Sequence, residues 1–331
     1  MDTATNAPRR TSSWRVVLKV VVSTVLMVFL LRRISLPELL TLVRGLDAGV
    51  FAGAVVCFFV SNVLGAYQWH QLLRSSGIEL GFGQTFRFYF VGLFFNNFLP
   101  ANIGGDAVKV YDVTRIGSSV YQVIAVTLLD RLLGIFSLCL LAFLSALFLI
   151  STEGSSPYGY YLIIFAACMV PAVGFYFFKP LGLMLRRLVL RIRPLSIDSR
   201  ATSILDQLSP FKGRRRLVMN LVGLSLFIQA LRVSTHVLVG VALGVPPGLI
   251  IVTQFFVFVP LLSLAMIPPI TINGLGIREG LGIVLFATAG MQQTDAFTLE
   301  FLTYVVSVAV SLLGLLFFIA RKRRPRDSKP V

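Results

Sequence analysis

Long apolar stretches alternate with short polar or basic stretches along almost the whole chain. Apolar stretches of a length suited to crossing the hydrocarbon core of a bilayer as helices occur at residues 16–31, 50–69, 120–150, 160–178, 217–243 and 300–320. No polar segment between them is long enough to fold alone, so a single membrane domain is predicted over residues 16–320. The pattern therefore predicts an all-α polytopic membrane protein with about six spanning helices.

Two further apolar stretches are interrupted before they reach spanning length. Residues 86–99 provide only 14 residues before Pro100, roughly 21 Å of helix against a hydrocarbon core of about 30 Å. Residues 249–267 lead into a second polar break at 271–279, and residues 280–289 return from it. In hydrocarbon, irregular backbone persists only where protein or water satisfies its N–H and C=O groups. The sequence therefore predicts two re-entrant helical hairpins that line a cavity. The residues expected to break these hairpins are Pro100, Gly104, Gly105, Pro269, Gly274 and Gly276.

The two breaks share a spacing of residues. Pro100, Gly105 and Lys109 follow the pattern P-x4-G-x3-K, and the second break follows P-x4-G-x3-R from Pro269 to Arg278. Interrupted apolar segments at corresponding places in two halves are typical of transporter binding sites. Because one hairpin is expected to enter from inside and the other from outside, the halves at about 50–178 and 217–320 are predicted to form an inverted repeat. The alternative is two unrelated membrane loops that share three residues by chance.

Composition and charge support a membrane protein and predict its orientation. The 331 residues are 56% hydrophobic and 13% charged, which excludes an ordinary water-soluble domain. A net charge of +16 often indicates nucleic-acid binding, but the basic residues here concentrate in a few non-apolar stretches. The positive-inside rule explains this better and predicts a cytoplasmic N-terminal segment at 1–15, a cytoplasmic loop at 179–216 and a cytoplasmic tail at 321–331. Three basic residues depart from this rule: Arg32, Arg33 and Arg44 follow the first span and are therefore expected on the outside. The expected location is the plasma (inner) membrane.

Few residues offer catalytic or metal chemistry. The three cysteines lie far apart in apolar stretches, and the two histidines form no metal-binding pattern. The chain has no Walker A motif, and NGLG at 273–276 lacks the strand context and third glycine of a dinucleotide fingerprint. We therefore expect no metal, no cofactor and no enzymatic activity.

Ionisable and amide side chains at membrane depth are the candidates for binding. Such residues are costly in a bilayer and usually face a bundle interior or a cavity. The expected substrate-binding residues are Asn97, Asn102, Asp106, Lys109, Asp130, Arg131, Arg232, Asn273, Arg278 and Glu279. Four of them are basic and three acidic, and helix N-termini after Gly105 and Gly274 would add positive dipole ends. This favours an anionic group such as a lipid phosphate.

Two structural explanations for these side chains stay open. The charged residues can be static ion pairs that lock the hairpins together, with Asp106 paired to Arg131 or Lys109. Asp130 and Arg131 are adjacent, and adjacent helical residues point about 100° apart, so they are not expected to pair with each other. Asp130 is then expected to pair with Arg232 or Arg278. Similarly, Asn96 and Asn97 can serve as hydrogen-bonding caps for the broken helix.

Three motifs read, in order, NNFLPANIGGDAVKVY, AVTLLDRLLG and PPITINGLGIREG. Together they resemble the flippase-like transmembrane family, which includes the membrane domain of bacterial lysylphosphatidylglycerol synthases. The resemblance covers about residues 15–320. The motif positions that it carries over are Asn97, Pro100, Gly104, Gly105, Asp106, Lys109, Asp130, Arg131, Gly134, Pro269, Gly274, Gly276, Arg278 and Glu279. The synthases add a soluble aminoacyl-transferase domain, which this sequence lacks, so synthesis of lysyl-lipid is not expected.

The resemblance implies movement of a lipid between leaflets. The expected function is therefore a flippase that carries a lipid with an anionic or polar headgroup through a groove between the hairpins. The alternatives are a non-transporting accessory subunit of a lipid or polysaccharide biosynthesis enzyme, and an integral-membrane transferase. The expected partners are a membrane lipid, a second copy of the chain or a lipid-synthesis enzyme, but no nucleic acid.

Overall fold

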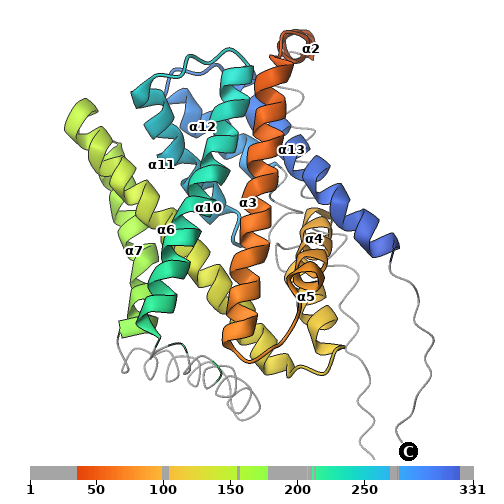
Figure 1. Cartoon of the computed structure of the whole chain (residues 1–331). Helices are drawn as coiled ribbons and strands as arrows, with labels where there is room; N and C mark the ends of the chain where they lie inside the picture. The colour runs from red at the N-terminus through yellow and green to blue at the C-terminus, as the bar shows by residue number, and fades with distance from the viewer. Residues whose placement is uncertain are drawn as a thin grey trace, which may run out of the picture.

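The described part of the chain is entirely helical. A computed structural model describes residues 36–98, 104–154, 157–177, 214–268 and 276–320, with Gln207, Phe211 and Gly274. Its helices are α2 (Leu36–Arg44), α3 (Ala48–Ser75), α4 (Phe82–Phe98), α5 (Gly104–Thr114), α6 (Val120–Glu153), α7 (Tyr158–Phe177), α10 (Arg215–Ala242), α11 (Leu249–Ala265), α12 (Ile277–Ala287) and α13 (Gln293–Ile319) (Figure 1). The expected first span at 16–31, the tail at 321–331 and nearly all of the loop at 179–216 lie outside the described residues.

Four helices have the length and apolar character needed to cross a membrane. They are α3, α6, α10 and α13, and each contains a window with mean hydropathy between 1.6 and 2.7. Two shorter helices, α11 and the first part of α7, are also apolar. The chain is therefore a multi-pass membrane protein, as the hydrophobic pattern predicted.

The helices fall into two units of matching lengths. Helices α3 and α10 both have 28 residues, α4 and α11 both have 17, and α5 and α12 both have 11. The last pair, α6 and α13, have 34 and 27 residues. Residues 76–81 and 243–248 form connections of equal length, as do residues 115–119 and 288–292. The hairpin tips differ, at residues 99–103 and 266–276, and α7 belongs to neither unit.

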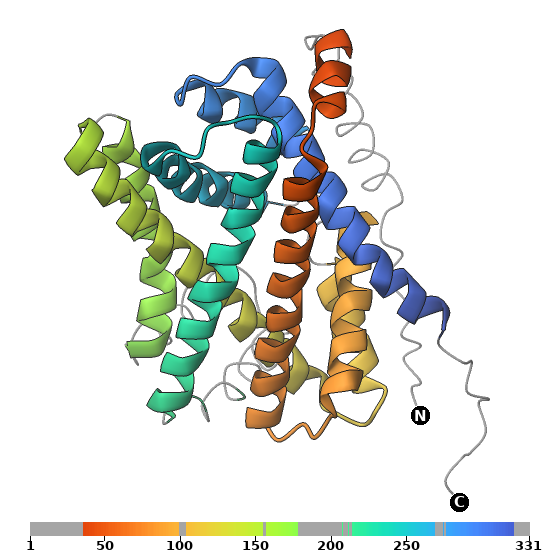
Figure 2. The ribbon, with the colours of Figure 1, turned by 45° about the horizontal axis from the view of Figure 1, so that its top comes forward.

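The two units run in opposite directions. The backbone N–H of Asp47, just before α3, donates to the carbonyl of Ala242 at the end of α10 over 3.0 Å. At the other end of the bundle, Arg214 Nη1 donates to the carbonyl of Ser75 over 3.1 Å. Helices α3 and α10 are therefore antiparallel neighbours. It follows that the α4–α5 hairpin opens at one end of the bundle and the α11–α12 hairpin opens at the other (Figures 1 and 2).

Glycines allow the first hairpin to pack tightly. A Cβ on Gly105 would lie 1.9 Å from the carbonyl oxygen of Gly92, so α4 and α5 cross almost backbone to backbone. A Cβ on Gly314 of α13 would lie 2.0 Å from the carbonyl oxygen of Phe90. Small residues at such crossings are a common way for helices to pack in membranes, where apolar burial offers little gain.

Two helix ends differ from the sequence prediction. Helix α3 continues past residue 69 to Ser75, because Leu72 and Leu73 are buried in the core beside Trp69. Helix α13 begins at Gln293 rather than at residue 300, where the last span was expected to start. A threonine in its first turns is satisfied by the helix itself, since Thr298 Oγ1 donates to a backbone carbonyl one turn earlier over 2.6 Å. In addition, the short helix α2 lies between the apolar stretches expected at 16–31 and 50–69.

Candidate functional site

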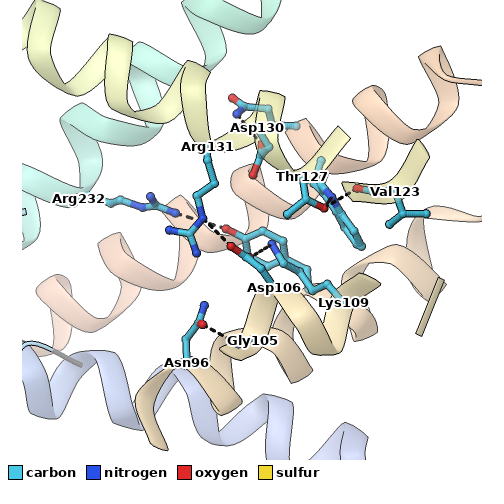
Figure 3. A network of polar contacts seen from close by, with 12 residues as sticks. Asn96, Gly105, Asp106, Lys109, Val123, Thr127, Asp130, Arg131 and Arg232 are labelled. Atoms are coloured by element: carbon cyan, nitrogen blue, oxygen red, sulfur yellow. Dashed lines mark hydrogen bonds and ion pairs between the residues drawn. The ribbon is translucent and has the colours of Figure 1, made fainter. Parts of the chain in front are cut away.

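A single carboxylate organises the polar cluster of the first hairpin. Asp106, in the first turn of α5, forms an ion pair with Lys109 on the same helix at 2.8 Å. Its other oxygen accepts a hydrogen bond from Arg131 Nε of α6, also at 2.8 Å (Figure 3). Both pairings that the sequence suggested for Asp106 therefore occur together, and they tie α5 to α6.

The ammonium group of Lys109 is enclosed by aromatic rings. It lies 5.1 Å from the centre of the Trp69 ring and 5.0 Å from that of Tyr89, within the range of cation–π attraction. Trp69 Nε1 in turn donates to Thr127 Oγ1 over 3.4 Å. The absent side chain of Gly92 leaves room for the lysine stem, since a Cβ there would lie 2.6 Å from Lys109 Cγ. Lys109 is thus buried and held from three sides.

The partners of the next two charged residues correct the sequence prediction. Asp130 was expected to pair with Arg232 or Arg278, but its Oδ1 accepts a hydrogen bond from the amide of Gln68 over 2.9 Å. Arg232, on α10, donates from Nη2 to the hydroxyl of Tyr89 over 3.3 Å. Among the described residues, Arg232 has no carboxylate partner. Its side chain points toward Arg131 and Asp106 (Figure 3).

The second hairpin forms a separate buried cluster. Arg278 Nη2 lies 2.7 Å from Glu279 Oε1, and Arg278 Nε lies 3.3 Å from Glu300 Oε2 of α13. His236 Nε2 of α10 lies 3.9 Å from the same Glu300 oxygen, and the guanidinium of Arg278 stacks on the ring of Tyr304 at 5.1 Å. The sequence suggested no particular partner for Glu279, and the structure pairs it with the adjacent Arg278. The two residues pair because both lie in the first turn of α12, where long side chains can fold back.

Each returning half-helix carries its own carboxylate near its N-terminus. Asp106 and Glu279 are both the third residue of their helices, α5 and α12. Glu279 Oε2 accepts the backbone N–H of Gly276 over 2.7 Å and so caps α12. The positive dipole ends that the sequence suggested for a ligand are thus partly offset by the chain's own acids. By contrast, the shared P-x4-G-x3 spacing aligns Lys109 with Arg278. These two residues lie at different distances from the first residues of their helices.

Glu300 changes the balance of charge that the sequence suggested. The sequence prediction does not include it, because the last span is expected to begin at residue 300. The observed helix starts at Gln293, which places Glu300 inside the bundle. With Glu300 counted, the two clusters together hold four basic and four acidic side chains. An excess of positive charge remains only in the cluster of the first hairpin. That cluster has three basic groups, Lys109, Arg131 and Arg232, against Asp106 and Asp130.

The residues at the hairpin tips divide between cap and contact roles. Asn96 Oδ1 accepts the backbone N–H of Gly105 over 2.8 Å and thereby satisfies the start of α5. Asn97 is buried, and its Oδ1 accepts a hydrogen bond from Ser307 of α13 over 3.4 Å. Gly274 and Gly276 have positive φ angles of 74° and 85°, which suits a break in the second hairpin. Four expected residues lie outside the described part of the chain: Pro100, Asn102, Pro269 and Asn273.

The described residues offer no arrangement for a metal ion. No group of three or more histidine, cysteine or acidic side chains among them is placed to hold one. The polar chemistry that they do offer is a set of ion pairs, hydrogen bonds and cation–π contacts.

Comparison with known proteins identifies relatives of this chain. The model of a family described as the lysylphosphatidylglycerol synthase TM region matches residues 16–314. The chain is also similar to a UPF0104 membrane protein of Pyrococcus horikoshii, at 24% identity over 330 residues. That alignment covers 92% of this chain and 97% of the relative. The match thus extends over both hairpins and both polar clusters.

Proposed function

This chain belongs to the lysylphosphatidylglycerol synthase TM region family, and we propose that it is a lipid flippase. It moves a lipid with an anionic or polar headgroup between the leaflets of the plasma (inner) membrane. The family indicates a membrane protein with a lipid-related function. The further step to transport of an anionic headgroup rests on the cluster of the first hairpin.

The observation that carries the proposal is the pair of guanidinium groups on α6 and α10. Arg131 has 45% of its side chain exposed although it is held by Asp106, and Arg232 has a phenol rather than a carboxylate as partner. A guanidinium group binds phosphate through paired, charge-assisted hydrogen bonds. In this cluster the basic groups exceed the acidic ones by one, which favours a single negative charge. We therefore assign the headgroup phosphate to Arg131 and Arg232, with Lys109 as a fixed buried charge nearby.

The hairpins supply a path for the headgroup in this proposal. Helix α4 has 17 residues, roughly 25 Å of helix, which is shorter than the hydrocarbon core of about 30 Å. We take both hairpins to be re-entrant, each from its own side of the membrane, with six spanning helices around them. Broken helices that meet near the midplane are the usual place for a transporter's binding site. The headgroup passes between the hairpins while the acyl chains stay in the bilayer.

A transport assay in proteoliposomes tests the proposal. The purified full chain is reconstituted with fluorescent phosphatidylglycerol, and movement between leaflets is followed by chemical quenching of the outer leaflet. Arg131→Gln and Arg232→Gln are each expected to lower the rate at limiting lipid roughly ten- to hundredfold, which corresponds to the loss of about 1.5–3 kcal/mol from a hydrogen bond to a charged group. Arg115→Gln is the matched control, because it removes an exposed arginine that stacks on Tyr111 outside the cluster.

The outcomes separate the proposal from its rivals. Unchanged transport in both cluster variants would remove Arg131 and Arg232 from the path. An absence of transport in the unmodified chain, together with a lipid- or polysaccharide-synthesis activity that needs a co-purified partner, would favour the accessory subunit. Turnover of a labelled headgroup donor by the pure chain would favour a transferase. The proposal itself requires no covalent step and no cofactor.

A further inference from the structure

The carboxyl group of Glu300 is fully buried without a hydrogen bond. Its residue is 0% exposed, and neither oxygen has a hydrogen-bond partner among the described residues. The nearest polar groups are Arg278 Nε at 3.3 Å and His236 Nε2 at 3.9 Å. A Cβ on Gly282 of α12 would lie 2.8 Å from Glu300 Cγ, so the side chain is packed against backbone on that side. A carboxylate buried without hydrogen bonds is costly in free energy, which favours the uptake of a proton or the binding of another partner.

The groups around Glu300 leave the cluster short of one positive charge. Helix α12 contributes Arg278 and Glu279, α10 contributes His236, and α13 itself contributes Tyr304. Arg278 makes its closest contact, 2.7 Å, with Glu279 rather than with Glu300. With both carboxylates ionised and the histidine neutral, one guanidinium group faces two negative charges. A single proton, on the carboxyl or on the imidazole, makes the buried cluster neutral.

The first unit shows that the fold does not need a titratable pair here. Counted from the helix starts, His236 of α10 corresponds to Trp69 of α3, and Glu300 of α13 corresponds to Thr127 of α6. Trp69 and Thr127 are joined by a hydrogen bond between two groups that keep their protons at neutral pH. The contact between α3 and α6 in the first unit is thus made by two neutral groups. The corresponding contact between α10 and α13 in the second unit is made by an imidazole and a carboxyl group. Packing alone does not account for the choice in the second unit.

We propose that His236 and Glu300 form a buried proton-binding site, with Arg278 as its fixed counter-charge. Resting on the proposed function, we assign this proton to the transport cycle, in which it accompanies the anionic headgroup. His236 and Arg232 are one turn apart on α10, and His236 Nδ1 lies 3.2 Å from the Arg232 carbonyl oxygen. Their separation of four residues corresponds to a rise of roughly 6 Å along the helix axis. A proton at Glu300 removes a negative charge close to Arg232, and a proton at His236 adds a positive one. In either case, anion and proton strengthen each other's binding.

Infrared difference spectroscopy of the full chain in lipid nanodiscs tests for the proton directly. Between about pH 8 and pH 5, the range in which histidine titrates, the unmodified protein is expected to develop the C=O stretch of a buried carboxylic acid. Glu300→Gln should lack this band. Glu153→Gln, which removes an exposed carboxylate at the end of α6, should retain it. His236→Phe keeps both carboxylates and should shift the pH at which the band develops, so it tests the pair even if the glutamine variant fails to fold.

A second measurement tests whether the proton takes part in transport. Flux of fluorescent phosphatidylglycerol is measured with an imposed pH gradient while the membrane potential is clamped. The unmodified chain should respond to the gradient by several-fold, and Glu300→Gln should not respond. Replacement of Na⁺ by N-methylglucamine should leave the flux unchanged; a requirement for Na⁺ instead would overturn the proton assignment.

The two proposals fail in different ways. Transport with neither a titrating band from Glu300 nor a pH-dependent imidazole band from His236 would overturn the proton site and leave the flippase standing. A band that depends on Glu300 without any lipid transport would support the proton site and contradict the flippase. A band that is lost in Glu279→Gln but kept in Glu300→Gln would also overturn the assignment.

Discussion

At the scale of single residues, the basic side chains of the two hairpins differ in kind. Arg278 lies buried between two carboxylates, whereas Arg131 is paired with Asp106 and keeps 45% of its side chain exposed. The sequence predicts both as substrate-binding residues, because it shows the type of a residue but not how many charged side chains surround it. We therefore expect Arg278 to matter chiefly for stability and Arg131 to be the better placed of the two to bind an anion.

Removal of Arg278 is expected to destabilise the protein. Arg278→Gln leaves Glu279 and Glu300 buried without a cation, and breaking a buried ion pair from one side typically costs about 3–5 kcal/mol. The melting temperature in detergent should therefore fall strongly, whereas Arg131→Gln should leave it nearly unchanged. The combined variant Arg278→Met, Glu279→Gln, Glu300→Gln should recover much of the loss, because no charge is then left unpaired. Equal melting of Arg278→Gln and the unmodified protein would show that this pair carries no stability.

At the scale of elements, the first hairpin depends on contact between two backbones. The crossing of α4 and α5 at Gly92 and Gly105 sets the distance at which Lys109 reaches its aromatic rings. Any side chain at the crossing separates the helices and so moves the lysine. The hairpin is therefore a rigid support for the first cluster.

Substitution of Gly105 tests this support. Gly105→Ala places a methyl group 1.9 Å from the Gly92 carbonyl, and overpacking of this kind typically costs about 1–3 kcal/mol or more. Melting should fall and lipid transport should fall with it. Gly83→Ala on α4, in the same hairpin, is the control: apart from its chain neighbours and its own helix backbone, no atom lies within 4 Å of its Cβ, and alanine favours helix over glycine. A Gly105→Ala protein as stable and active as the control would contradict the tight crossing.

The sequence predicted these elements and contacts best where polar residues mark the ends of helices or bond to residues nearby in the chain. It located α6, α7 and α10 well, because their apolar runs end at clear polar or basic segments. It missed the first turns of α13, where polar residues bond to their own helix. It predicted the ion pairs of Asp106, which link neighbouring parts of one half, but not the contact of Asp130 with Gln68 across 62 residues. Partners that are distant in sequence leave no local pattern to detect.

At the scale of the whole molecule, the ends of the bundle differ in charge. Arg74, Arg115 and Arg214 lie at the end where the α4–α5 hairpin opens, whereas the connections at 243–248 and 288–292 at the opposite end contain no lysine or arginine. Arg44, beside the start of α3, is again the exception. The positive-inside rule therefore directs the first of these ends to the cytoplasm.

Cysteine labelling tests this orientation. Cys57, Cys139 and Cys168 are first replaced by alanine. Single cysteines are then introduced by Glu153→Cys or Gln292→Cys, at the end of the bundle that is expected to face outside. These should react with a membrane-impermeant maleimide in intact cells. Single cysteines from Glu79→Cys or Ser119→Cys, at the other end, should react only after permeabilisation. The reverse pattern would invert the assignment, and labelling of all four positions in intact cells would contradict a fixed orientation.

Helix α7 decides how the second unit is oriented. The first unit, from α3 to α6, starts and finishes at the same end of the bundle, since it holds two full-length helices and a hairpin that returns to where it began. A second copy joined directly to it would run in the same direction as the first. Helix α7 carries the chain back to the opposite end before α10 begins (Figures 1 and 2). The inversion is thus a matter of parity: one added helix turns a tandem pair into a pair of opposed halves, and two added helices would cancel it.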